Sequence, residues 1–280
     1  MKTRIITGGL LLSFIPWLSA APITQGTFTE IVRDVEVLED AAKKTRRAEV
    51  SSLIKTPDQV RTGPQSRAEL ATPDQTVTRV GANSVFSFEA GTREINLEKG
   101  SVLFYTPPGK GGLKIKTSGA SAAVLGTTII VAATSDGGFK IIGLEGTARV
   151  AIPGGRSRSL HAGQVMFVLP GQREFGPIAD VNLNTLIRTA ILVKGFKKPL
   201  PSLPLIQKEI NKQQQLLATG QATDTGVSPE EAAIKKKFKS SVDDTGQLIA
   251  LSVRGYVPTI IKSSDPRKPP PPPLAPPPFR

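Results

Sequence analysis

The 280-residue sequence predicts a mainly β protein, followed by short helices and a proline-rich tail. Three observations support this. Between Thr27 and Leu169, short runs rich in Val, Ile, Phe and Thr alternate apolar and polar positions, which is the side-chain periodicity of strands. Gly, Pro, Asp and Asn separate the runs, as in turns. Helical periodicity begins only after Pro177. Many short strands with such turn signals are typical of a sandwich, a barrel or a solenoid.

The chain begins with the pattern of a secretory signal peptide. Lys2 and Arg4 precede an apolar run from Ile5 to Leu18, and small residues follow it. This run is shorter than the ~20 apolar residues that a membrane-spanning helix needs. We therefore expect residues 1–20 to be cleaved near Ala20. The mature protein would then be periplasmic or secreted, with no transmembrane helix after cleavage.

The composition limits the chemistry and the partners. The chain has no cysteine, which excludes disulfides and thiolate metal sites. Its net charge of +13 favours anionic lipid head groups, wall polymers or nucleic acid as partners, although solubility alone accounts for it equally well. No stacked aromatic motif accompanies the charge, so nucleic acid is not expected.

The expected strands follow one another closely along the chain. One turn form, L-x-x-G-x-V, occurs at residues 97–102 and 160–165, with a shorter relative at 144–147. The spacing of these turns is not fixed, so a strictly regular repeat is not expected. The clearest strand candidates are residues 67–71, 76–80, 84–88, 93–97, 101–105, 113–117, 127–133, 139–143, 147–152 and 164–169.

The apolar pattern changes phase by one residue at Gly126–Thr127. Val124 and Gly126 share one face of an extended strand, whereas Ile129 and Val131 continue the apolar face in the other phase. Such a slip fits a β-bulge or a sharp bend, which glycine permits. We therefore expect the chain to turn a corner here. The expected core residues are Val124, Ile129, Val131, Ile141, Val150, Val165 and Phe167.

The C-terminal part predicts helices and then an extended tail. Residues 180–193 have a helical apolar face, with Asp180 as a possible cap, and residues 205–217 form a Gln-rich second helix. A capping box at residues 228–231 opens a short basic helix to about residue 237, and residues 246–253 form a strand or an amphipathic piece. The apolar face of the first helix would consist of Leu183, Leu186, Ile187, Ala190 and Ile191.

These features divide the chain into four parts. After the signal peptide, we expect an all-β domain over residues 25–170 and a helical or linker region over residues 178–262. A disordered, basic, proline-rich tail then covers residues 263–280, because its prolines favour polyproline II over helix or sheet.

No motif predicts catalysis, a cofactor or a metal. His161 is the only histidine, so it cannot build a usual zinc site without cysteine, and no G-x-S-x-G motif accompanies it. Residues 108–112 lack the spacing of a phosphate loop, which favours a hairpin loop there. The adjacent carboxylates at residues 230–231 and 243–244 do not face each other, so they are poor acid/base pairs.

An ordered set of motifs resembles the FecR domain family. The family's D-x-[VL]-x-T-G element corresponds to residues 58–63, S-R-A-x-L to residues 66–70, and its next strand to residues 79–84. INLEKGSVLFY (95–105) and AVLGTTIIV (123–131) follow in the family's order, and LEGTARV (144–150) and LHAGQVMFV (160–168) are similar to its closing strands. The positions that carry the family's structural motif are Gly63, Gly81, Gly100, Gly126, Thr127, Gly146 and Gly163.

The resemblance implies an extracytoplasmic, irregular β-solenoid or β-roll. Founding members of the family relay a signal from an outer-membrane receptor to a cytoplasmic sigma factor. Because this sequence carries an export signal and not the sigma-binding segment, we expect a stand-alone exported member. The resemblance then implies a non-catalytic module of the cell envelope that senses a signal or binds and scaffolds a partner.

Two kinds of partner and one other function class remain open. The β domain would bind an envelope protein through a strand edge or a face, or the basic C-terminal half would hold the chain on anionic envelope polymers. The alternative is a secreted carbohydrate-active enzyme on the same β scaffold. That enzyme would need two or three carboxylates converging in a cleft.

Overall fold

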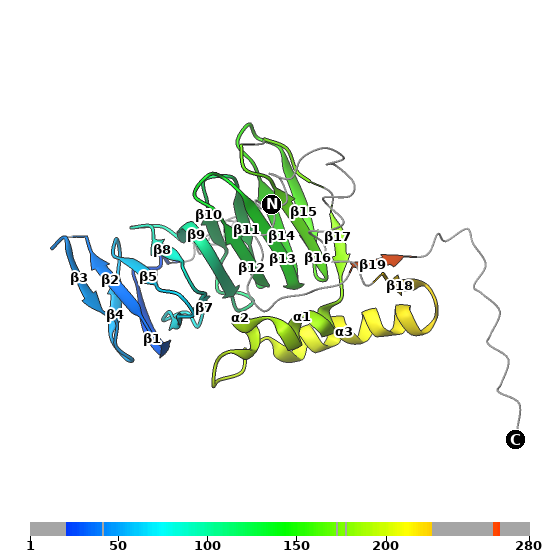
Figure 1. Cartoon of the computed structure of the whole chain (residues 1–280), viewed down its shortest axis with the longest axis horizontal. Helices are drawn as coiled ribbons and strands as arrows, with labels where there is room; N and C mark the ends of the chain where they lie inside the picture. Colours follow the sequence, from blue (N-terminus) through cyan, green and yellow to red (C-terminus); the bar gives the residue numbers. More distant parts are fainter. Residues whose placement is uncertain (1–20, 41, 172, 177, 226–259, 264–280) are drawn as a thin grey trace, which may run out of the picture.

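The computed structural model describes residues 21–40, 42–171, 173–176, 178–225 and 260–263. Within them the chain is mainly β, with a few short helices, as the sequence predicts. Two sheets pack face to face, and Figure 1 shows their strands side by side. The signal peptide and the elements expected over residues 228–237 and 246–253 lie outside the described residues. Of the tail expected over residues 263–280, only Ser263 is described, and it lies in a strand that pairs with Ala222 instead of being disordered.

Sheet A contains eleven described strands and is antiparallel throughout. Its order is β4-β1-β6-β7-β9-β12-β13-β16-β17-β19-β18. The bounds are β1 Gln25–Val32, β4 Leu53–Lys55, β6 Arg67–Ala71, β7 Val77–Val80, β9 Glu94–Tyr105, β12 Thr128–Ala133, β13 Phe139–Glu145, β16 Gln164–Val168, β17 Ala179–Val181, β18 Ala222–Asp224 and β19 Ile260–Ser263.

Sheet B has the order β3-β2-β5-β8-β9-β10-β11-β14-β15, and only its β9–β10 pair is parallel. Its remaining strands are β2 Val35–Glu39, β3 Lys44–Arg47, β5 Gln59–Thr62, β8 Val85–Phe88, β10 Leu113–Lys116, β11 Ser121–Val124, β14 Thr147–Ala151 and β15 Ser157–His161. This pairing confirms the β class, and the sheets are not closed. It does not establish the solenoid coiling that the sequence predicts.

Strand β9 belongs to both sheets. Its first half pairs with β8 and β10 in sheet B, and its second half pairs with β7 and β12 in sheet A. The two strands expected at residues 93–97 and 101–105 are therefore one bent strand. Pairing continues through Lys99, opposite Val85, up to Gly100, whose positive φ of 97° allows the bend. The same bend makes residues 106–112 a connection to the parallel partner β10, not the expected hairpin loop.

Apolar side chains fill two separate cores. The first lies between the sheets and contains five of the expected core residues, Val124, Ile129, Val131, Ile141 and Val150. The second lies between the outer face of sheet A and the helices, and it contains the other two, Val165 and Phe167. All seven are buried, as predicted. Strands of sheet A are apolar on both faces because both faces are covered.

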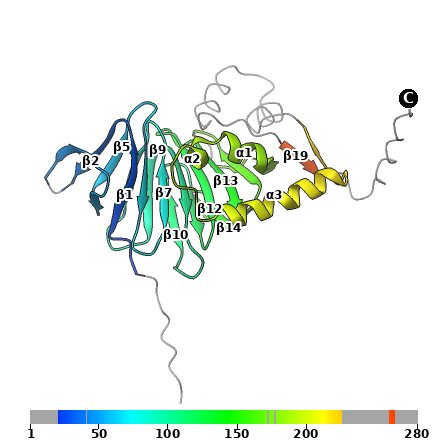
Figure 2. The same ribbon diagram turned by 90° about the horizontal axis from the view of Figure 1, so that it is seen from below.

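Three helices cover the outer face of sheet A. They are α1 Leu183–Thr189, α2 Ile191–Lys194 and α3 Leu203–Ala218. In Figure 1 they run together below the strands, and Figure 2 shows them along one side of the sheets. Helix α3 agrees with the helix expected at residues 205–217. No described helix is long and apolar enough to span a membrane.

The helix expected over residues 180–193 is two short helices. The backbone at Ala190 is extended (ψ 116°), which ends α1 and redirects the chain so that Leu192 and Val193 are buried. Asp180 is not the cap, because it lies in β17 opposite Gln164. Instead the Asn182 side chain accepts a hydrogen bond from the Thr185 backbone N–H at 3.1 Å.

Candidate binding surface

Each of the six glycines named from the sequence lies where the chain passes between the sheets. Gly63 lies between β5 and β6, Gly81 between β7 and β8, and Gly100 within β9. The other three lie between β11 and β12 (Gly126), between β13 and β14 (Gly146) and between β15 and β16 (Gly163).

Two of these passages pack against each other. Gly126 has a φ of +60°, and a Cβ added there would lie 3.1 Å from Pro108 Cα. A Cβ on Gly146 would lie 2.6 Å from Thr127 Cγ2, and Thr127 is itself buried. The corner expected at Gly126–Thr127 is thus the link between a strand of sheet B and a strand of sheet A. The nearest atoms are those of the chain itself.

The outer face of sheet A is occupied by the chain's own C-terminal segment. Arg79 in β7 is fully buried and donates hydrogen bonds to Glu69 Oε2 (2.8 Å) and to the carbonyls of Leu192 (3.2 Å), Val193 (2.7 Å) and Lys198 (2.5 Å). Its guanidinium also lies 4.5 Å from the centroid of the Phe196 ring, in the same segment. The part of this face that lies under the C-terminal segment, from β7 to β16, is therefore not available to a partner.

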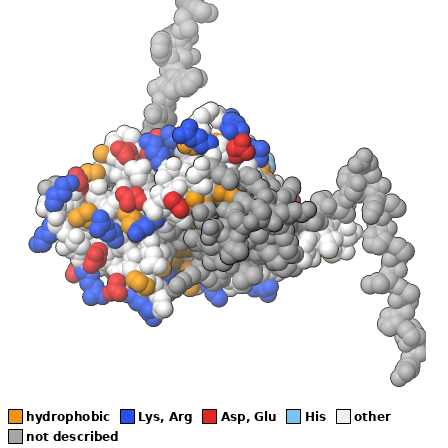
Figure 3. Space-filling model, turned by 45° about the horizontal axis from the view of Figure 1, so that its top comes forward, with side chains coloured by type: hydrophobic (Ala, Val, Ile, Leu, Met, Phe, Trp, Pro, Cys, Tyr) orange, Lys and Arg blue, Asp and Glu red, His pale blue; other side chains and the backbone are white. Residues whose placement is uncertain are grey.

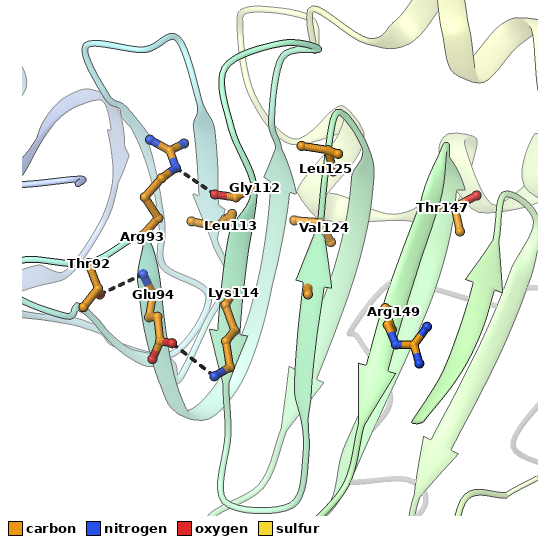
Figure 4. Close-up of a pocket in the computed structure, with 11 residues that line it drawn as sticks. Thr92, Arg93, Glu94, Gly112, Leu113, Lys114, Val124, Leu125, Thr147 and Arg149 are labelled. Carbon is orange, nitrogen blue, oxygen red and sulfur yellow. Dashed lines mark hydrogen bonds and ion pairs between the residues drawn. The ribbon is translucent and has the colours of Figure 1, made fainter. Parts of the chain in front are cut away.

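The outer face of sheet B is open and carries a shallow cavity of about 600 Å³. Figure 4 shows residues of β9, β10, β11 and β14 around it, with Lys114 on β10 and Arg149 on β14. Leu125 projects beside them and is 67% exposed. Arginine is enriched among the residues that dominate the energy of protein interfaces, and Leu125 adds exposed apolar area beside it. The lining residues are Thr92, Arg93, Glu94, Gly112, Leu113, Lys114, Ala123, Val124, Leu125, Thr147 and Arg149.

Ion pairs set the charge of this cavity. Lys114 Nζ lies 3.1 Å from Glu94 Oε1, and Lys116 contacts the other carboxylate oxygen. The pKa of Glu94 is lowered, mainly by the hydrogen bond from Lys116 and then by the hydrogen bond from Lys114 and the charges of both lysines. This carboxylate is therefore ionised at neutral pH. Arg149 donates instead to the Ser157 hydroxyl at 2.8 Å, which leaves its charge uncompensated within the described residues.

Charge on the surface is mixed. In the view of Figure 3, basic and acidic side chains are interspersed over the coloured surface. A second cavity of about 560 Å³ continues along β9 and β10 and includes Asn96 and Lys116, and a third of about 360 Å³ lies beside β15. Each of these three cavities is lined by a single carboxylate, namely Glu94, Glu98 and Glu174.

The other residues considered from the sequence do not join this surface as a chemical site. His161 is exposed at the end of β15, with Nδ1 at 3.2 Å from the Thr147 hydroxyl. The adjacent carboxylates at residues 230–231 and 243–244 lie outside the described residues. Sequence reasoning missed Leu125 and Arg149, although an apolar residue directly before the phase change at Gly126 was a usable signal.

One comparison with known proteins, the match to a family model, agrees with the motif order. Residues 58–149 match the family model described as FecR protein. No curated protein matches the chain. Two crystal structures of a candidate anti-sigma factor from Parabacteroides distasonis ATCC 8503 are similar. The alignment with the 1.65 Å structure has 18% identity and a TM-score of 0.39, and it covers 44% of this chain and 59% of the other chain. The alignment with the 2.50 Å structure has 14% identity and a TM-score of 0.40, and it covers 63% of this chain and 71% of the other chain.

The region that matches the family model begins in the loop before β5 and ends within β14, so it contains five of the six inter-sheet glycines. The resemblance seen in the sequence is therefore confirmed: residues 58–149 of this chain carry a FecR domain.

Proposed function

We propose that this chain is an exported, non-catalytic FecR-domain protein that binds another protein of the cell envelope, as a signal-sensing or scaffolding module. The observation that carries the proposal is the contrast between the two outer faces. The helices cover sheet A, whereas sheet B presents an open surface with Leu125 and Arg149. A partner of this domain would approach from the side of sheet B.

The proposal includes no catalytic residue, cofactor or metal. Each of the three cavities has one lining carboxylate, whereas a carbohydrate-active enzyme needs a converging pair. The described residues contain no group of three His, Cys, Asp or Glu side chains suited to a metal ion. A binding function uses what the surface does offer, which is the exposed Leu125 and the charge of Arg149, which has no counter-charge among the described residues.

The proposal also assigns the four parts of the chain. Residues 1–20 direct export, and residues 25–170 are the FecR-type β domain with roll-like or solenoid-like strand stacking. Residues 178–262 are a helical and linker region that also adds β17, β18 and most of β19 to sheet A. Residues 264–280 are the basic, proline-rich tail, since Ser263 pairs with Ala222 in sheet A. The proposal gives the glycines at the inter-sheet passages, together with Thr127, a structural role, because a side chain at Gly126 or Gly146 would collide with the turn packed against it.

Salt distinguishes binding through sheet B from anchoring by the basic tail. The Debye length falls from ~10 Å at 0.1 M to ~3 Å at 1 M salt, so electrostatic anchoring to anionic polymers weakens steeply. The full chain and a chain ending at Ser263 would be sedimented with native cell envelopes at both salt concentrations. We expect both chains to pellet at 1 M salt, because the exposed Leu125 contributes an apolar contact that salt does not screen.

Paired variants identify the face. Leu125→Asp with Arg149→Glu should abolish pelleting at 1 M salt, whereas Arg61→Glu, an exposed change elsewhere on the same sheet, should not. Binding that disappears on removal of residues 264–280 would identify the tail as the anchor. If no form pellets at 0.1 M salt, the chain does not bind the envelope and the proposal is wrong.

A further inference from the structure

We propose that the free edge of β15 accepts an extended acidic segment of a partner protein as an added strand. This inference rests on the proposed function, because it specifies how an envelope protein would bind on the side of sheet B. Strand addition is a common mode of peptide recognition, in which backbone hydrogen bonds provide affinity and side chains provide specificity.

The hydrogen-bond pattern shows which backbone groups of β15 are free. Among the described strands, β15 pairs only with β14. The Ala162 N–H donates to the Gly146 carbonyl (3.1 Å), and the Ile152 N–H donates to the Arg156 carbonyl (3.1 Å). Since backbone groups alternate in direction along a strand, the even-numbered residues of β15 face β14. The N–H and C=O groups of Ser157 and Ser159 therefore point away from the sheet.

One further group on this edge is already satisfied. The His161 N–H points the same way, and it donates to Gln164 Oε1 at 3.0 Å. The open part of the edge therefore covers Ser157 and Ser159, which offer two donors and two acceptors with the spacing of one antiparallel or parallel partner strand. The cavity of about 360 Å³ lies directly beside this part.

The other sheet edges among the described strands are less suitable. The edge strand β3 consists of Lys44, Thr45, Arg46 and Arg47, and charged edge strands resist pairing. Strands β4 and β18 each have only three residues. Strand β15 has five residues, and its two outward-facing positions are small serines. It is therefore the edge best suited to an additional strand.

The charge beside this edge selects an acidic partner. Arg149, Arg156 and Arg158 flank it, and no described carboxylate lies within ion-pair distance of them. Arg156 donates to the Arg173 carbonyl (2.9 Å), and Arg158 lies 5.3 Å from the centroid of the Phe175 ring. These contacts hold the guanidinium groups in place without neutralising them.

One carboxylate near the edge constrains the register of the added segment. Glu174 lines the cavity beside Arg156 and Arg158. An acidic side chain next to Glu174 would be repelled, so the acidic positions of the partner should lie on the face of β15 that carries Arg156 and Arg158, away from Glu174. The inferred ligand is therefore an extended chain with alternating acidic residues.

Labelled heptapeptides test the inference with the full chain by fluorescence anisotropy. The probes are a peptide of alternating Val and Glu, one of alternating Val and Lys, and the Val-Glu peptide with alternate backbone amides methylated. The first peptide should bind most tightly, and the Lys and methylated peptides should bind at least about tenfold more weakly. Equal binding of all three peptides, or no binding of the first, would overturn the proposal.

Two sets of variants locate the site. Ser159→Pro removes an edge N–H that does not pair with β14, so it should lower affinity by at least about tenfold while the thermal midpoint is kept, and Ser159→Ala should bind normally. If Ser159→Pro does not fold, Arg156→Glu with Arg158→Glu serves instead. This charge reversal should transfer preference to the Lys peptide. Unchanged peptide preference would contradict the inference.

The two proposals fail in different ways. If wild-type chain pellets with envelopes at 1 M salt and the Ser159→Pro and charge-reversal variants do so equally, the binding function holds and the strand-addition site is wrong. If wild-type chain does not pellet at all, the proposed function fails whatever the peptides show.

Discussion

At the scale of single residues, the inter-sheet passage at Gly126 leaves little room for a side chain. Gly126 combines a left-handed backbone with a close approach to the Pro108 backbone. Gly155, in the turn before β15, has a comparable φ of +85° but nothing within 4 Å of an added Cβ. The two positions therefore share the conformational cost of a side chain, and only Gly126 adds a steric one.

Gly126→Val should destabilise the protein more than Gly155→Val does. We expect an additional loss of about 1–3 kcal/mol from overpacking against Pro108, beyond the left-handed strain that both variants share. Urea unfolding of the two variants and wild type measures the difference. Equal losses would mean that the passage at Gly126 can relax, and that its tight packing has no energetic role.

Glu145 introduces a dependence of stability on pH. This carboxyl is only 7% exposed, and it lies 2.9 Å from the Thr128 hydroxyl, which in turn lies 2.7 Å from the Ser202 hydroxyl. Burial raises the pKa of Glu145, with a further contribution from Glu209, and the Thr128 hydrogen bond opposes the shift only in part. The folded state therefore binds a proton more tightly than the unfolded state.

Glu145→Gln should gain stability relative to wild type as the pH rises. Because the folded pKa lies above the unfolded value of about 4.3, the wild-type contribution is fully present below that pH and is lost as the pH rises through the folded pKa. Unfolding free energies measured between pH 4 and 8 test this, with the exposed Glu49→Gln as control. A stability difference that does not vary with pH would contradict the prediction.

At the scale of elements, Arg79 connects the family domain to the helices outside it. Its partners include Glu69 on the neighbouring strand β6 and carbonyls at and after the end of α2. A second arginine in the same sheet, Arg67, donates to the Gly195 carbonyl at 2.6 Å. Strands β6 and β7 thus hold the segment between α2 and α3, which positions all three helices on sheet A.

Arg79→Met should destabilise the protein by about 3–5 kcal/mol, because it leaves Glu69 buried without its counter-charge. Arg79→Lys should be intermediate, since an ammonium group can pair with Glu69 but cannot reach all three carbonyls. Guanidinium chloride unfolding measures both losses, with exposed Arg61→Met as the control. A loss no larger than that control would show that this network does not hold the helices.

At the scale of the whole molecule, the protein has three layers: sheet B, sheet A and the helices. The two sheets bury apolar side chains between them, but sheet A is also apolar on its outer face, under the helices. Leu103, Ile130 and Ile142 belong to the core under the helices. The segment after the boundary expected near residue 178 covers this apolar face with helices and adds strands β17, β18 and β19 to sheet A.

A chain that ends at Ile178 should expose this apolar face. We expect it to bind the dye ANS and to self-associate, whereas a chain that ends at Ser263 keeps α1–α3 and the β17–β19 pairing and should do neither. ANS fluorescence and sedimentation compare the two. Monomeric, ANS-silent behaviour of the shorter chain would show that the β domain is stable without its helices.

The residue pattern alone was sufficient to predict much of this molecule. Alternation predicted the β class and the seven core residues, because burial on one face of a strand imposes a period of two. The phase change at Gly126 predicted the corner, and the order of glycine-containing motifs predicted the FecR domain that the family model matches. The alternation and the phase change are local, so neighbouring residues were enough to reveal them, whereas the family resemblance needed the order of motifs along the chain.

Long-range pairing decided the rest. Only the tertiary structure joined residues 93–97 and 101–105 into one strand, since that depends on partners from both sheets. Only the tertiary structure buried Arg79 under a loop more than 110 residues away, covered sheet A with helices, and left sheet B open beside Leu125 and Arg149. An isolated segment cannot show which face another segment will cover, so the candidate binding surface was set by how distant parts of the chain pack together.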